Sequence, residues 1–158
     1  LEEVDEKQKK SFWYTMAMAS MAMTDSVNSL TELPTNEQFF LKTAKAIEEL
    51  YETESCVIIG RCANSILKNK KNVLSIFVYS SDEEFKVQRK VRYAGLNEKE
   101  AVKIIRKMDK ERASYYNYYT DGKWGAKEEY DLCIDTSKIG VDNAVELIIK
   151  LASLKGLI

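Results

Sequence analysis

Basic side chains at helical spacing are the feature of this 158-residue sequence that most suggests chemistry. They recur at steps of four, three and four residues, as Lys99, Lys103, Arg106 and Lys110. In a helix these positions lie on one face, where unpaired like charges reduce helix stability. The row therefore favours a ligand with several negative charges, such as a phosphate chain. A solvated helix face is the alternative interpretation.

Arg112 follows this row, three residues after Asp109. The two side chains form either part of an anion site or an ordinary intrahelical ion pair, which contributes a few tenths of a kcal/mol, about 0.3. Three tyrosines come next, Tyr115, Tyr118 and Tyr119. At this spacing they predict either a packed helix face or a platform for a nucleobase.

The composition excludes several kinds of site. The sequence has no histidine, which rules out Ser-His-Asp and Cys-His catalysis and most catalytic zinc sites. A net charge of -1 argues against nucleic-acid binding by bulk electrostatics. The three cysteines Cys56, Cys62 and Cys133 show no C-x-x-C spacing and cannot all pair, so we expect the reducing cytoplasm. The apolar residues 12–23 are shorter than a bilayer span of about 20 residues, and we expect no membrane anchor.

Three apolar, β-branched runs are the elements that must position these side chains. They cover residues 56–59, 74–78 and 132–134, and each precedes a helical pattern, at 62–68, 82–93 and 141–154 respectively. Runs without apolar/polar alternation are typical of strands covered on both faces. The strand-helix alternation predicts an α/β fold with a parallel sheet and flanking helices.

Helices are also predicted before and between these units. One covers residues 5–23, and a second covers 36–51, opened by Pro34 and a polar cap. Asn97 and Glu100 resemble a capping box at the start of the basic helix. The methionine-rich residues 16–23 are interpreted as core or pocket lining, with a partner surface as the alternative.

Four stretches in this order resemble the cytidylate-kinase-like family of P-loop nucleoside monophosphate kinases. They read CVIIGRCA (56–63), FVYSSDEE (77–84), MDKERASYYNYYTDGKWG (108–125) and YDLCIDTSKIG (130–140). The resemblance covers most of residues 56–154 and only loosely residues 5–51. It implies one kinase-like domain over residues 1–158: a helical monophosphate-binding region at 1–54, core strands and helices at 55–96, a lid at 97–125 and a carboxyl-terminal core at 126–158.

The resemblance also implies roles for individual residues. Catalytic cations of the lid would be Arg106, Lys110 and Arg112. Substrate-binding residues would be Arg61, Arg89, Arg92 and Asp109. Nucleotide-binding residues would be Thr136, Lys138 and Ile139. For Arg61 the reason is physical as well, since a Gly-Arg at the carboxyl end of a parallel strand displays a guanidinium over the ligand crevice, where it would contact the acceptor's phosphate.

The implied activity is phosphoryl transfer from ATP to a CMP-like monophosphate, with Mg²⁺ on the donor phosphates. Cys62 stands where cytidylate kinases usually carry an acid, so the acceptor base stays open. The implied partners are small-molecule nucleotides, without nucleic acid or membrane, and a homo-oligomer stays open. Two alternatives are a non-catalytic nucleotide- or phosphate-binding module of the same fold and an interaction domain using the methionine-rich helix.

A P-loop, G-x-x-x-x-G-K-[ST], does not occur in this sequence, which begins with Leu1 rather than Met. We expect a truncated chain whose P-loop and first strands lie upstream. The resemblance implies that the missing strand sits between residues 56–59 and 74–78, so those runs would lie about two strand spacings, roughly 9.6 Å, apart. Such a chain is expected to be poorly soluble and, alone, unable to transfer phosphate.

Overall fold

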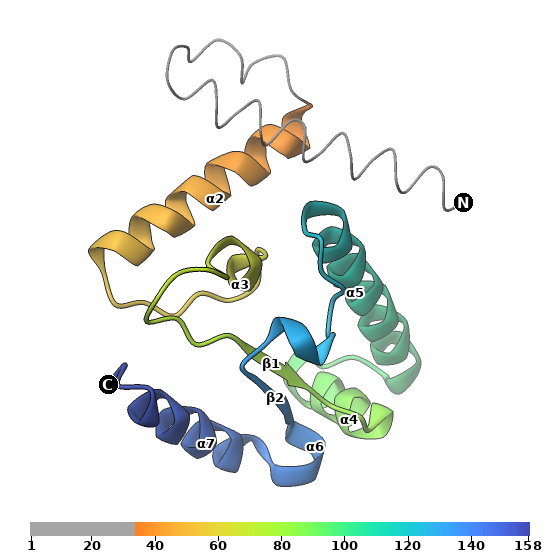
Figure 1. Ribbon diagram of the computed structural model, residues 1–158. Helices are drawn as coiled ribbons and strands as arrows, with labels where there is room; N and C mark the ends of the chain where they lie inside the picture. The colour runs from red at the N-terminus through yellow and green to blue at the C-terminus, as the bar shows by residue number, and fades with distance from the viewer. Residues whose placement is uncertain (1–33) are drawn as a thin grey trace. The chain divides into compact units, whose positions relative to one another are not determined.

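Residues 34–158 are described by the computed structural model of the chain (Figure 1). Along the sequence the elements are α2 (Thr35–Thr53), α3 (Ala63–Ile66), β1 (Ile76–Tyr79), α4 (Glu83–Ala94), α5 (Glu98–Tyr119), the 3₁₀ helix η2 (Lys127–Glu129), β2 (Leu132–Asp135), α6 (Thr136–Ile139) and α7 (Val141–Leu154). The predictions for residues 5–23, including the methionine-rich segment, lie outside the described residues.

A small parallel sheet joins β1 to β2, with Ile76 opposite Leu132 and Tyr79 opposite Asp135. Because parallel strands need a long crossover connection, α4 and α5 lie between them in the sequence. Ile134 is buried, as expected for the third apolar run. The fold is therefore a helix-rich α/β arrangement, and the prediction of a parallel sheet is confirmed for the second and third runs.

The prediction of a strand at residues 56–59 is wrong for the described chain, because this segment has no regular secondary structure. Val57 and Ile59 are 92% and 90% exposed. An apolar, β-branched composition favours a strand only where a neighbouring strand satisfies its backbone N–H and C=O groups. In place of the expected buried strand, the residues in front of Arg61 form an exposed segment without regular secondary structure.

Helix boundaries follow the capping signals closely. The carboxylate of Asp82 accepts a hydrogen bond from the amide of Phe85 at 3.0 Å and caps α4, which ends at the left-handed Gly95. The capping box of α5 is confirmed, since the Asn97 side chain accepts from the Glu100 amide at 2.9 Å and Glu100 accepts from the Asn97 amide at 3.3 Å. At α2 the polar cap is wrong: Pro34 is the N-cap, and no side chain caps it.

Two compact units divide the chain. Of the described residues, unit 1 comprises residues 34–67 with Tyr116–Asp121, and unit 2 comprises Lys68–Tyr115 with Gly122–Ile158. Among the described residues, the apolar core of unit 1 consists of Phe40, Ala44, Ile47, Cys62, Ala63, Leu67, Tyr116 and Tyr119. The core of unit 2 consists of Val87, Ala101, Ile134 and Ala144.

An aromatic cluster packs around Phe77 of β1. The centroids of the rings of Tyr130, Trp124 and Tyr79 lie 5.0, 5.4 and 5.7 Å from that of Phe77. Gly125 lies against this cluster with a φ of +77°, and a Cβ placed there would lie 3.1 Å from the Phe77 ring. A side chain at position 125 would therefore meet both a strained backbone and a packed ring.

Gly125→Ala is expected to lower the free energy of unfolding by about 2–3 kcal/mol, because the left-handed backbone disfavours a Cβ by about 1–2 kcal/mol and the Phe77 contact adds overpacking. Gly95→Ala is the matched control, since Gly95 has a φ of +64° but nothing within 4 Å of the added Cβ. Urea unfolding of both variants separates the two contributions. Equal losses in the two variants would show that Phe77 exerts no steric constraint.

Candidate functional site

Arg61 is the second of three consecutive residues with a left-handed backbone. Gly60, Arg61 and Cys62 have φ values of +74°, +56° and +58°. For a residue with a side chain this conformation costs about 1–2 kcal/mol, so Arg61 and Cys62 are held there by their surroundings. Strained backbone of this kind concentrates at functional sites.

The loop is held by hydrogen bonds and burial. The amide of Ala63 donates to the carbonyl of Gly60 at 3.1 Å, and Cys62 is 3% exposed. The side-chain amide of Asn64 donates to the Tyr116 hydroxyl at 2.9 Å. These contacts fix the backbone on the carboxyl side of Arg61, while the side chain of Arg61 itself stays exposed.

The Arg61 guanidinium lies 5.8 Å from the centroid of the exposed Phe39 ring. Among residues 34–158 it forms no ion pair with a carboxylate. A guanidinium over an aromatic face keeps its in-plane N–H donors available. Arg61 therefore has the geometry needed for a forked contact to a phosphate.

Burial raises the pKa of the Cys62 thiol from 9.0 to about 11. Because the thiolate is the nucleophile, only roughly 0.1% of Cys62 is reactive at pH 8. Iodoacetamide at pH 8 is therefore expected to label the exposed Cys56 and leave Cys62 unmodified until the protein unfolds. Mass spectrometry of digested protein, with a urea-unfolded sample as control, measures this; equal labelling of both residues in the folded protein would contradict the burial of Cys62.

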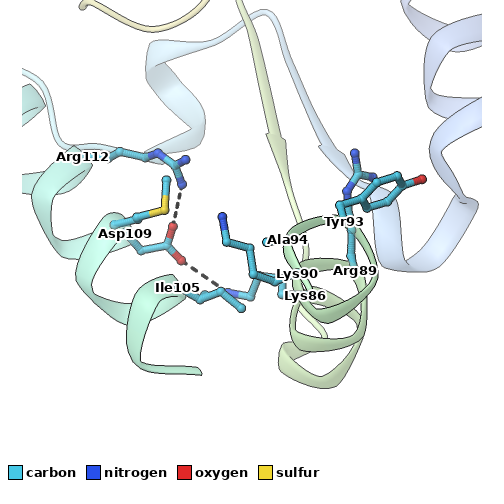
Figure 2. A pocket seen from close by; sticks show the side chains of 9 residues that line it. Lys86, Arg89, Lys90, Tyr93, Ala94, Ile105, Asp109 and Arg112 are labelled. Carbon is cyan, nitrogen blue, oxygen red and sulfur yellow. Dashed lines mark hydrogen bonds and ion pairs between the residues drawn. The ribbon is translucent and has the colours of Figure 1, made fainter. Parts of the chain in front are cut away.

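A cavity of about 420 Å³ lies in unit 2, between α4 and α5 (Figure 2). Its volume is in the range of small-molecule sites. The lining side chains are Lys86, Arg89, Lys90, Tyr93, Ala94, Ile105, Met108, Asp109 and Arg112. Four of them are cations and one is an acid, so the cavity attracts negatively charged ligands.

Asp109 links the two helices that form this cavity. Its Oδ1 accepts a hydrogen bond from Nη1 of Arg112 at 3.0 Å, and its Oδ2 lies 3.5 Å from Nζ of Lys86. Figure 2 shows the carboxylate between these two cations. The interpretation of Asp109 and Arg112 as an intrahelical ion pair is correct, and the pair also lines the cavity. Arg112 uses one of its five N–H donors in this contact.

A second group of cations surrounds Tyr93. The guanidinium carbons of Arg89 and Arg92 lie 5.5 and 5.8 Å from the centroid of the Tyr93 ring. Tyr93 itself is 75% exposed. Arg89 and Tyr93 line the cavity, at its edge farther from Asp109 in Figure 2, whereas Arg92 does not line it. The structure thus brings together Arg89, Asp109 and Arg112 of the predicted site residues.

The interpretation of the basic row of α5 as unpaired charges is wrong for Arg106. Its Nε and Nη2 both donate to Oε1 of Glu83, at 3.1 and 3.0 Å. The reason is the packing of α5 against α4, which brings an acid from the first turn of α4 opposite Arg106. Neither Arg106 nor the exposed Lys110 lines the cavity.

The predicted nucleotide-binding residues lie in α6, directly after β2. The Thr136 hydroxyl donates to the carbonyl of Tyr79 at 3.0 Å, so it fastens α6 to β1. Hydrogen bonds from Ser137 of α6 and from Ser81, which follows β1, lower the pKa of the neighbouring Asp135 to about 2, so the carboxyl end of β2 stays charged. Lys138 and Ile139 are exposed, and none of these residues lines the cavity between α4 and α5.

The tyrosines of α5 that belong to unit 1 pack on α2. Tyr119 stacks on Phe40 with ring centroids 4.2 Å apart and planes 6° apart. The Tyr118 hydroxyl donates to Oε1 of Glu37 at 3.2 Å, and burial together with that bond raises the pKa of Tyr118. The packed-face interpretation is therefore correct for these two residues, because the stacking face of Tyr119 is already occupied by Phe40.

Sequence reasoning missed six of the cavity residues, namely Lys86, Lys90, Tyr93, Ala94, Ile105 and Met108. A signal was present, because Lys86, Lys90 and Tyr93 recur at steps of four and three and so share one face of α4. That row faces the cavity, whereas the more conspicuous basic row of α5 contributes nothing to its lining.

Neither a metal cage nor a membrane span is found in the part of the chain that the structure describes. Residues 34–158 contain no group of three or more metal-ligating side chains. The side chains of these described residues therefore form no ready-made cage for Mg²⁺. None of the described helices is both long and apolar enough to cross a bilayer.

Comparisons with known proteins agree with this architecture. A crystal structure of an uncharacterized protein from Eubacterium ventriosum ATCC 27560 is similar to the chain, with a TM-score of 0.71 and 35% sequence identity over 79% of this chain and 70% of that one. No curated protein matches. The profile of the cytidylate kinase-like family matches residues 1–138. Because this match covers most of the sequence, the chain belongs to the cytidylate kinase-like family.

Proposed function

We propose that the protein is a nucleoside monophosphate kinase-like phosphotransferase that moves a phosphoryl group from ATP to a CMP-like acceptor. The observation that carries this proposal is the cavity between α4 and α5, in which Lys86, Arg89, Lys90 and Arg112 face one acid. Membership of the cytidylate kinase-like family supports the reaction class.

In this reaction an oxygen of the acceptor's phosphate attacks the γ-phosphorus of ATP. The bond between that phosphorus and the β–γ bridging oxygen breaks, ADP leaves, and the acceptor becomes a diphosphate. Such transfer depends mainly on positioning and on stabilising negative charge. Mg²⁺, when bound with the donor nucleotide, neutralises part of that charge.

The cations have different proposed roles. Arg112 would contact the transferring group, supported by Lys86 and Arg89 in the same cavity. Arg61 would hold the acceptor's phosphate by a forked contact, which its exposed guanidinium supports. Arg106 is a weaker candidate than Arg112, because Glu83 occupies two of its donors.

A second candidate function is nucleotide or phosphate binding without turnover. It is favoured by one observation, namely that Arg112 and Lys86 are already paired with Asp109. Cations that keep a fixed counter-charge stabilise a developing charge less than unpaired ones.

The test is a transfer assay on the full-length natural protein. With ATP, Mg²⁺ and a panel of nucleoside monophosphates, we expect the diphosphate of a pyrimidine monophosphate to form, together with one ADP for each product. A thermal-shift panel of the same nucleotides measures binding independently. Stabilisation by nucleotides without transfer would support the binding module, and neither signal would contradict both proposals.

A further inference from the structure

Asp109 is the one acid among the nine side chains that line the α4–α5 cavity, and it sits between two of the four cations. Its carboxylate spans the helices, with Arg112 of α5 at 3.0 Å and Lys86 of α4 at 3.5 Å. The other two lining cations, Arg89 and Lys90, form no ion pair within residues 34–158. One half of the cavity, at Arg112 and Lys86, is therefore partly neutralised by Asp109. The other half, at Arg89 and Lys90, keeps its positive charge.

A carboxylate and a phosphate group use the same donors. Both present two oxygens to a guanidinium or an ammonium group at about 2.7–2.9 Å in well-formed contacts. The Lys86–Asp109 separation of 3.5 Å is longer than that, and the side chains of Lys86 and Asp109 are 34% and 33% exposed. Partly solvated ion pairs are weak, so an incoming anion of higher charge can replace this carboxylate.

The charges of the cavity indicate the class of ligand. Four cations and one acid leave an excess of three positive charges. A monoanion cannot neutralise this excess, and it gains little by displacing a carboxylate of equal charge. A linked pair of phosphate groups carries enough charge for both halves of the cavity, and a volume of about 420 Å³ accommodates it.

We infer that this cavity binds a diphosphate-type polyanion and that Asp109 occupies the position of one of its phosphate groups while the ligand is absent. The inference rests on the proposed function only for the identity of the ligand as a nucleotide's phosphate chain. Binding moves Arg112 and Lys86 from Asp109 to the ligand. Since Asp109 is the ion-paired link between α4 and α5 inside the cavity, ligand binding also releases that link.

The test measures the affinity of inorganic pyrophosphate for the full-length protein by isothermal titration calorimetry. Asp109→Asn is expected to bind pyrophosphate about tenfold more tightly than the wild type, because a competing negative charge is removed. Glu111→Gln is the matched control. It removes the same charge from the same helix, but Glu111 pairs with Lys107 and does not line the cavity, so its affinity should stay within about twofold.

An unchanged or weaker affinity of Asp109→Asn would overturn the inference, since Asp109 would then be a support for the cations rather than a substitute for the ligand. Asp109→Ser is a second neutral variant in case Asp109→Asn does not fold. The location is tested by Lys90→Ala, which should weaken pyrophosphate binding about tenfold, against Lys99→Ala, an exposed cation of α5 outside the cavity. Equal effects of these two variants would show that the ligand binds elsewhere.

Orthophosphate in the same titrations should bind at least tenfold more weakly than pyrophosphate, and equal affinities would contradict a two-phosphate site. Pyrophosphate binding requires no phosphoryl transfer, so the outcomes separate. Tighter binding by Asp109→Asn in a protein without kinase activity would overturn the proposed function alone. Unaltered binding in an active kinase would overturn this inference alone.

Discussion

Replacing Arg112 by alanine is expected to lower the turnover number of phosphoryl transfer by about a hundredfold, while Arg106→Ala changes it by less than about threefold. The two arginines lie on the same helix and differ in their surroundings. Arg112 lines the cavity and gives one donor to Asp109, whereas Arg106 gives two donors to Glu83 and lies outside the cavity. A group that stabilises the transition state affects turnover more than substrate binding.

Steady-state kinetics with saturating ATP and acceptor measure this difference, and melting temperatures show whether each variant folds. Both side chains are solvent-accessible, at 54% for Arg112 and 70% for Arg106, so neither truncation leaves a buried void. Similar turnover in the two variants would contradict the assignment of Arg112. A lower melting temperature of Arg112→Ala with normal turnover would show that its pair with Asp109 is only structural.

Arg61→Ala is expected to lower kcat/KM for the monophosphate by about tenfold to a hundredfold and to leave KM for ATP nearly unchanged. Loss of a charge-assisted forked contact to phosphate is worth about 1.5–3 kcal/mol. Arg61→Lys is the matched variant, because it keeps the charge and loses the fork; its value should lie between those of wild type and alanine.

Kinetics with each substrate varied in turn provide the measurement. Equal losses for ATP and monophosphate would contradict a specific role of Arg61 at the acceptor. Alanine and arginine have similar costs in the left-handed conformation. The loop of residues 60–62 should therefore keep its shape in this variant.

Local signals predicted the helices well, because caps act within a few residues. Asp82 and the pair Asn97 and Glu100 start α4 and α5 through bonds that span three residues. The strand at residues 56–59 could not be predicted in the same way. Its existence depends on a neighbouring strand, and an apolar run does not reveal whether the chain provides one.

The candidate site shows the same division between local and tertiary information. The contact of Asp109 with Arg112 spans three residues and was among the predicted alternatives. The contacts of Arg106 with Glu83 and of Asp109 with Lys86 span 23 residues each and depend on how α4 packs against α5. Helical spacing therefore identified which residues share a face, but not which face borders the cavity.

The left-handed backbone at Arg61 implies that stability and activity would select different residues there. Glycine and asparagine adopt this conformation at lower cost than arginine, and the equally left-handed Asn72 is already asparagine. A library randomised at position 61 and screened only for heat resistance should become enriched in glycine and asparagine. The same library screened for phosphorylation of the acceptor should be enriched in arginine. A difference between the residues enriched in the two screens would show that Arg61 is retained for activity at a cost in stability.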